Sequence, residues 1–214
     1  MIRPTFWCAV LALVCGVSAL VAQGQRPVRD DVGFCWDAAQ MARFVRFLET
    51  CEDQVTAPQG FVAAISPHDD YLYAGRIMAP VFRSLRAKEV ILIGVTHRVV
   101  RNEIGDPKGV LILDAFETWY GPRGPVRISP LRERIRAQMD SSMLLVSNRA
   151  HMLEHSLEAM IPFVQHYNPE ARIVPLMVTI MDPDRMEKVS ARLAAIVARY
   201  CRERKRVLGK DLVF

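Results

Sequence analysis

Two stretches decide the fold: Phe61-Val-Ala-Ala-Ile65-Ser-Pro-His68 and Glu89-Val-Ile-Leu-Ile-Gly-Val-Thr-His97. Each is a short, continuously apolar run that stops at a polar turn carrying a histidine. Such runs are typical of strands that are buried on both faces of a parallel sheet. The sequence therefore predicts strands at residues 61–65 and 89–95, each followed within three residues by a histidine.

Outward from these runs, helical and strand patterns alternate along the chain. Apolar residues at helical or strand spacing predict helices at 37–48, 74–85, 131–139, 154–167 and 184–204, and strands at 110–113, 143–146 and 172–178, with a further strand beginning within 206–214. Asp182 or Asp184 is the candidate N-cap of the last helix. This alternation predicts an α/β fold with a mostly parallel sheet flanked by helices.

The C-terminal residues look like the middle of a strand. Leu212-Val-Phe214 is apolar and would expose an unpaired edge of the sheet. We therefore expect the sheet to be incomplete at the C-terminus and the chain to be truncated.

The N-terminal residues have the layout of a secretory signal peptide. Arg3 precedes an uncharged run from Phe6 to Ala22, and polar residues follow. We expect a signal peptide at 1–24, a mature domain at 26–214, and an exported protein, periplasmic or secreted. Stable membrane association is expected only if this segment stays uncleaved, because it is almost long enough to span a bilayer.

Three cysteines would remain after cleavage: Cys35, Cys51 and Cys201. In an oxidising compartment the simplest arrangement is one disulfide and one free thiol, with Cys35–Cys51 as the candidate pair. The alternative is three reduced, packed thiols.

Composition and charge exclude some function classes. Hydrophobic residues make up 51% and charged residues 24%, which excludes a disordered chain. The net charge is +5, but the basic residues are scattered, and the one dense run coincides with the end of the last predicted helix, where cations complement the helix dipole: Arg199, Arg202, Arg204, Lys205 and Arg206. We do not expect nucleic-acid binding.

His68 and His97 are the candidate metal ligands. In an open α/β sheet, ligands bind beyond the carboxyl ends of the strands, and both histidines are predicted there. If strands 61–65 and 89–95 were neighbours, the two imidazoles could meet at one ion, each about 2.1 Å away. The alternative for each is a hydrogen-bonded surface histidine.

A third motif, His151-Met-Leu-Glu-His155, supports two other interpretations. His-x-x-Glu-His on a helix is the signature of inverted zinc peptidases, in which both histidines bind zinc and the glutamate activates water. Such a site needs a further acidic ligand, which the chain does not clearly offer. Alternatively, Glu154 and Glu158 complement a helix N-terminus.

Taken together and in order, the motifs resemble the Memo family, which includes the AmmeMemoRadiSam system protein B. The resemblance runs from about Arg26 to Phe214 and rests on five segments: Ser66-Pro-His-Asp-Asp-Tyr-Leu-Tyr-Ala-Gly75, Ile91-Leu-Ile-Gly-Val-Thr-His97, Glu154-His-Ser-Leu-Glu158, Ile161-Pro-Phe-Val-Gln165 and Ile173-Val-Pro175. The family is similar in fold to class III extradiol dioxygenases, which hold ferrous iron with two histidines and one further ligand.

The resemblance implies a role for each matching residue. His68 and His97 would bind Fe2+ or another divalent metal, while Glu154 and His155 would be catalytic, His155 as acid/base or substrate-orienting group. Four neighbours would contact the substrate or support the ligands: Asp69, Asp70, Tyr71 and Thr96. The two aspartates replace the family's Ala-Gly, and they would be extra ligands, partners of His68, or simply turn residues.

The expected function is that of an iron-dependent, dioxygenase-like or redox enzyme acting on an unknown small substrate. The alternative is a non-catalytic protein that binds a peptide or small ligand in the same cleft; the zinc peptidase comes third. A radical enzyme is a further candidate partner. Because the family's later motifs and third ligand would follow Phe214, we expect the 214-residue polypeptide by itself to be inactive.

Overall fold

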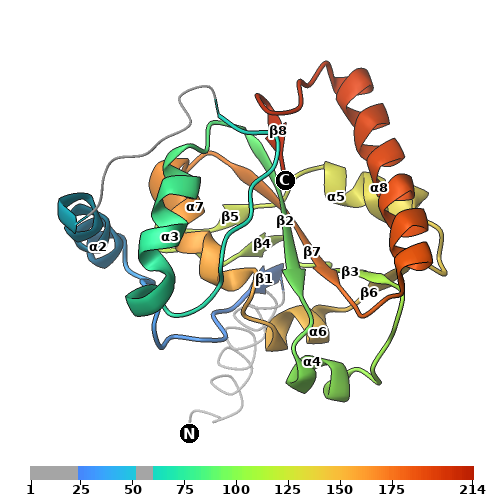
Figure 1. Cartoon of the computed structure of the whole chain (residues 1–214), viewed down its shortest axis with the longest axis horizontal. Coiled ribbons are helices and arrows are strands. Elements are labelled where there is room, and N and C mark those ends of the chain that lie inside the picture. The colour runs from blue at the N-terminus through green and yellow to red at the C-terminus, as the bar shows by residue number, and fades with distance from the viewer. Residues whose placement is uncertain (1–23, 52–59) are drawn as a thin grey trace, which may run out of the picture.

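The computed structural model describes residues 24–51 and 60–214 (Figure 1), so nearly all of the predicted signal peptide lies outside the described residues. The helices are α2 (Ala38–Cys51), α3 (Tyr71–Arg83), α4 (Arg98–Glu103), α5 (Leu131–Gln138), α6 (Asn148–Leu153), η1 (Glu158–Met160, a 3-10 turn), α7 (Ile161–Tyr167) and α8 (Pro183–Arg204). The strands are β1 (Gln25–Arg26), β2 (Glu89–Val95), β3 (Leu111–Leu113), β4 (Thr118–Trp119), β5 (Val126–Arg127), β6 (Leu144–Val146), β7 (Arg172–Val178) and β8 (Leu212–Val213). Within this described part, no helix is both long and apolar enough to cross a membrane.

The main sheet has five strands in the order β6-β3-β7-β2-β8, and β1, β4 and β5 form a small second sheet. The central strands β2 and β7 run parallel along their whole length, from Glu89 opposite Arg172 to Val95 opposite Val178. β8 is parallel to β2 and β6 to β3, whereas β3 and β7 are antiparallel. The prediction of an α/β fold with a mostly parallel sheet is confirmed.

Helices cover both faces of this sheet (Figure 1). Ile173 in β7 faces a core that contains Met41 of α2, Met78 of α3 and Phe163 of α7. Val174, the next residue, faces the opposite core with helices α5 and α8. Because successive side chains of a strand point to opposite faces, a continuously apolar strand requires this double cover.

The predicted strand at 61–65 is wrong. Residues 60–70 form an extended segment without regular secondary structure, and Ile65 is 95% exposed. Two backbone hydrogen bonds attach the segment to the end of β8, from Phe214 N to Val62 O (3.0 Å) and from Ala64 N to Phe214 O (3.1 Å). No described strand lies beside the rest of the segment, and Val62 and Ile65 remain exposed, whereas Phe61 packs against the core.

Several boundaries differ from the prediction for local reasons. α3 begins at Tyr71, three residues before the predicted start. The predicted helix at 154–167 is a loop followed by η1 and α7. Of the two candidate N-caps of α8, Asp182 is the one used, because its side chain accepts a hydrogen bond from Arg185 N at 2.8 Å.

The predicted Cys35–Cys51 disulfide is also wrong. All three described cysteines are free, with Cys35 buried and Cys51 exposed. Helix α2 separates the pair, and its 14 residues span about 21 Å. A disulfide needs Cα atoms within about 7 Å of each other, so the alternative of three reduced thiols holds.

Candidate metal centre

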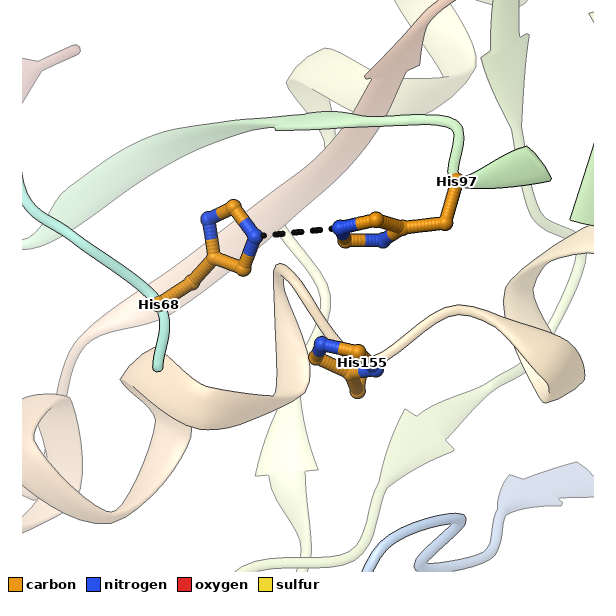
Figure 2. A group of neighbouring side chains, drawn as sticks. All are labelled: His68, His97 and His155. Carbon is orange, nitrogen blue, oxygen red and sulfur yellow. Dashed lines mark hydrogen bonds between the residues drawn. The ribbon is translucent and has the colours of Figure 1, made fainter. Parts of the chain in front are cut away.

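Three histidines meet at the carboxyl end of β2 (Figure 2). His68 comes from the extended segment before α3, His97 is the second residue after β2, and His155 lies in the loop after α6. One ring nitrogen from each lies within 4.8 Å of the others. The loop that carries His155 therefore completes a cluster for which the sequence indicated His68 and His97 as ligands.

The distance between the first two rings suits a shared ion. His68 Nε2 and His97 Nε2 are 3.4 Å apart. Two nitrogens that are each about 2.1 Å from one ion, at a tetrahedral angle, lie about 3.4 Å apart. The ring of His155 stacks on that of His97, with centroids 4.8 Å apart and planes at 20°. His68 Nε2 and His97 Nε2 are also within hydrogen-bonding distance of each other when one of the two neutral rings carries its proton there.

Glu154 lies behind His97 and is buried. Its carboxylate contacts His97 twice, at the backbone amide (2.8 Å) and at ring Nδ1 (2.7 Å). It also accepts hydrogen bonds from the amides of His155 (3.0 Å) and Ser156 (2.9 Å). A carboxylate in this position orients the His97 ring so that Nε2 points to the other two histidines.

Burial and hydrogen bonding shift the pKa values of this group. Burial by itself would raise the pKa of Glu154, but hydrogen bonds from the amides of His97 and Ser156 and from the His97 ring outweigh it and hold the pKa below its usual value. Burial, followed by the nearby imidazoles of His97 and His155, lowers the pKa of His68 below 6.5. A carboxylate that stays ionised and an imidazole that stays neutral are the forms that support metal binding.

The four residues expected to contact the substrate or support the ligands have other surroundings. Tyr71 is buried in the core, where its hydroxyl donates to Ala159 O at 2.6 Å. Thr96 is also buried, and its hydroxyl donates to Val178 O at 3.1 Å, joining the ends of β2 and β7. Both hydroxyls are therefore engaged by backbone carbonyls inside the fold, and a role of either residue in binding substrate or supporting the ligands stays a prediction.

Asp69 and Asp70 serve the turn that starts α3. Asp69 Oδ1 accepts from the Asp70 amide at 2.8 Å, and the Asp70 carbonyl accepts from Ala74 N at 2.9 Å. Neither carboxylate belongs to the histidine cluster. Of the alternatives for this pair, the turn preference is the one that these contacts favour.

The inverted zinc-peptidase motif does not form. Helix α6 ends at Leu153, so His151 and His155 are not one turn apart on a helix. His151 is fully buried, and its Nε2 lies 3.1 Å from the carbonyl oxygen of Ile112. His151 and His155 therefore cannot bind the same ion, and the zinc-peptidase interpretation is wrong.

An ion pair that the sequence did not indicate anchors the His155 loop. Arg26 of β1 pairs with Glu158, and both side chains are at most 2% exposed. Arg26 also donates to the carbonyls of His151 (Nε, 2.8 Å) and Glu154 (Nη2, 2.8 Å). One alternative for Glu158 was to complement a helix N-terminus. In the structure it neutralises a buried arginine 132 residues away in sequence, a partnership for which no local pattern exists.

Comparisons with known proteins agree with these motifs. The family model described as Memo-like protein matches residues 36–212. A MEMO1 family protein of Aquifex aeolicus is 35% identical over 123 residues, covering 56% of this chain and 42% of the relative. MEMO1 family proteins of Methanosarcina barkeri (27% over 143 residues; 66% and 50% covered) and Thermococcus kodakarensis (28% over 160 residues; 71% and 49% covered) are also similar. The chain spans about half the length of these curated relatives.

Proposed function

The chain belongs to the Memo family, and from that premise we propose that His68, His97 and His155 hold one divalent metal ion, ferrous iron, in a redox or dioxygenase-like protein. The observation that carries this proposal is the convergence of three imidazoles from separate parts of the chain, with two Nε2 atoms 3.4 Å apart. Imidazole suits iron, zinc, copper and nickel alike, so the donor set supports a divalent metal in general. The resemblance to the extradiol dioxygenases is what favours iron.

Three nitrogen ligands would leave positions on the ion for a substrate or for oxygen, and a bound ferrous ion would supply the redox chemistry. The chain's own part is to hold the ligands. Glu154 keeps the His97 ring oriented, and the lowered pKa of His68 keeps that ligand neutral. The side chain of His97 is 41% exposed, so a small molecule can reach the cluster from solvent.

Two further expectations remain proposals. We infer that the chain is exported, because its first residues have the layout of a secretory signal peptide. We also infer that it is part of a longer protein, because it covers about half of its relatives. Full activity would then require the longer polypeptide, whereas metal binding by the three histidines requires residues already present. A binding protein without turnover would use the same three histidines and remains the alternative.

Anaerobic titration with Fe(II) tests the metal site in the 214-residue chain. His68→Ala and His97→Ala should each weaken binding by about 100-fold, because one of three ligands is lost. The matched control is His166→Ala, since this histidine lies in α7 outside the cluster; its affinity should stay within about twofold of the parent.

An equal loss of Fe(II) affinity in all three variants, or an unchanged affinity in His68→Ala, would contradict the proposed metal site. Parallel titration with Zn(II) examines the choice of iron: if zinc binds and Fe(II) does not, the metal site survives and the iron proposal fails. Oxygen uptake by the iron-loaded longer protein separates an enzyme from a binding protein.

A further inference from the structure

A pocket of about 510 Å³ lies at the amino ends of β2 and β7. The three histidines are at the other end of β2, and the seven residues of this strand place its two ends about 20 Å apart. In Figure 1, β8 and the end of α8 lie near the top, whereas α4, which directly follows His97, lies at the bottom. The pocket is therefore separate from the candidate metal centre.

Cationic side chains dominate the lining of this pocket, which we call the basic pocket. Two carboxylates also line it, those of Glu89 and Glu170. Five positive charges against these two negative charges leave the lining with a formal charge of +3. The five cationic residues are Lys88, Arg127, Arg172, Arg204 and Arg206.

The dipole of α8 explains only part of this gathering. Cations at the C-terminal end of a helix complement its dipole, which accounts for Arg204 in the last turn of α8. Lys88 directly precedes β2, Arg127 ends β5 and Arg172 begins β7. These three cations lie on no helix and are far apart in the sequence, and only the fold brings them together. Because like charges repel one another, such a group is stabilised when an anion joins it.

The two carboxylates neutralise only two of the five cations. Arg206 Nε lies 3.2 Å from Glu89 Oε1, and Arg127 pairs with Glu170. Among residues 24–51 and 60–214, no hydrogen bond or ion pair engages the side chains of the other three cations: Lys88, Arg172 and Arg204. These three side chains are exposed and are available to a ligand.

Buried groups fix the inner wall of the basic pocket. Glu89 is 2% exposed, and its Oε2 accepts hydrogen bonds from the hydroxyls of Tyr200 (2.9 Å) and Ser129. The other oxygen of this carboxylate holds Arg206, whose side chain is 35% exposed. A guanidinium that is already held in place loses less conformational freedom when a ligand binds.

We propose that the basic pocket binds a small compound that carries phosphate groups. Four of its five cations are arginines, and a guanidinium forms paired hydrogen bonds with phosphate oxygens. A compound with several negative charges would balance the charge of the lining. A concave pocket suits a small molecule, whereas a nucleic-acid backbone requires an extended basic stripe. The proposal involves no metal and does not depend on the proposed function.

Isothermal titration calorimetry with inorganic pyrophosphate, at about 0.15 M salt, tests the basic pocket. The 214-residue chain should bind one equivalent with a Kd of about 100 μM or tighter. Arg172→Gln and Arg204→Gln should each weaken binding by about tenfold or more, because each removes a charge-assisted hydrogen bond to the ligand. Both side chains are exposed and unpaired, so neither substitution should disturb the fold.

Two control variants separate the pocket from other causes of binding. Arg202→Gln removes the same charge from the same end of α8, but Arg202 does not line the pocket. Its affinity for pyrophosphate should stay within about twofold of the parent, because salt screens charges that do not contact the ligand. His68→Ala should also bind pyrophosphate like the parent, since the histidines lie at the other end of β2.

Several outcomes would overturn the proposal. Pyrophosphate could fail to saturate the parent chain, or Arg202→Gln could lose as much affinity as Arg172→Gln, which would mean unspecific attraction to a basic surface. A loss of binding in His68→Ala would place pyrophosphate at the histidines. Tighter binding of citrate or of a short DNA duplex, weakened by the same two pocket substitutions, would assign the pocket to carboxylates or to nucleic acid.

Discussion

The two apolar runs that end in histidine, 61–65 and 89–95, look alike in sequence and differ in the structure. Run 89–95 is β2, which pairs with β7 along its length; its first four residues are buried, with Ile91 only 1% exposed, although Ile93 and Val95 near its end are exposed. Run 61–65 is an extended segment with Ile65 95% exposed. An apolar run therefore indicates only that its side chains favour burial. Whether they are buried depends on the segments that pack against the run.

The same contrast continues into the candidate metal centre. His97 rests on a sheet strand and is held by a buried carboxylate at two points. His68 lies at the end of the uncovered segment and contacts His97 across 3.4 Å. The His97 ring thus has a buried carboxylate as its support, whereas the His68 ring contacts the rings of His97 and His155.

The largest expected effect comes from the Arg26–Glu158 ion pair, which anchors the His155 loop. Glu158→Gln removes the largest favourable charge interaction of buried Arg26 and leaves only the weaker ones with Asp114 and Glu154, so the free energy of unfolding should fall by about 3–5 kcal/mol. Glu170→Gln is the matched control, because Glu170 pairs with Arg127 at an exposed site, and its cost should be under about 1 kcal/mol. Urea denaturation measures both variants. Similar losses of the free energy of unfolding would mean that the buried Arg26–Glu158 pair stabilises the fold no more than an exposed pair does.

Truncating one isoleucine in each run tests the comparison directly. Ile91→Ala should lower the free energy of unfolding by about 2–5 kcal/mol, because it opens a cavity in the core. Ile65→Ala should change it by less than about 0.5 kcal/mol, because the side chain is exposed. Urea denaturation again decides: a cost for Ile65→Ala close to that of Ile91→Ala would show that the segment is covered in solution.

The pH dependence of the free energy of unfolding tests the burial of His151. Burial lowers the pKa of His151 to about 3. Between pH 6.5 and about 3 the unfolded chain binds a proton that the folded chain rejects, so stability is lost as pH falls, by up to about 1.4 kcal/mol per unit from this group.

His151→Gln removes this titration and should flatten the fall between pH 6.5 and 5 by about 2 kcal/mol. Thermal or urea unfolding at each pH measures the effect. Parallel pH profiles for the variant and the parent would contradict a buried neutral His151.

The smallest expected effect is a difference in metal affinity between variants of Glu154, which contacts His97, and of Asp69, which lies next to His68. Glu154→Gln should weaken metal binding by about 10- to 100-fold, because the carboxylate orients His97. Asp69→Asn, on the His68 side, should leave affinity within about threefold, since Asp69 contacts a turn amide instead of the ring. The Fe(II) or Zn(II) titration that tests the histidines serves here, and a larger loss for Asp69→Asn would reverse this assignment.

Local patterns were enough to predict much of the fold. β2 and β7 lie where their apolar runs predict them, and helix α8 begins after Asp182, one of the two predicted caps. His97 followed from the β2 run, because a strand end can be recognised from its own residues, whereas His68 reaches the cluster from an extended segment that was predicted to be a strand. The strand prediction for 61–65 failed because burial on both faces depends on partners that the run does not contain.

What the sequence determined by itself was the kind of element at most places and the family motif that carries His68, His97 and His155. Tertiary structure alone decided that His155 joins the other two while His151, four residues earlier, enters the core. It also decided that Glu154 supports a ligand and that Arg26 pairs with Glu158. The physical reason is range: helix and strand patterns act over a few residues, whereas burial and charge pairing depend on segments that meet only after folding.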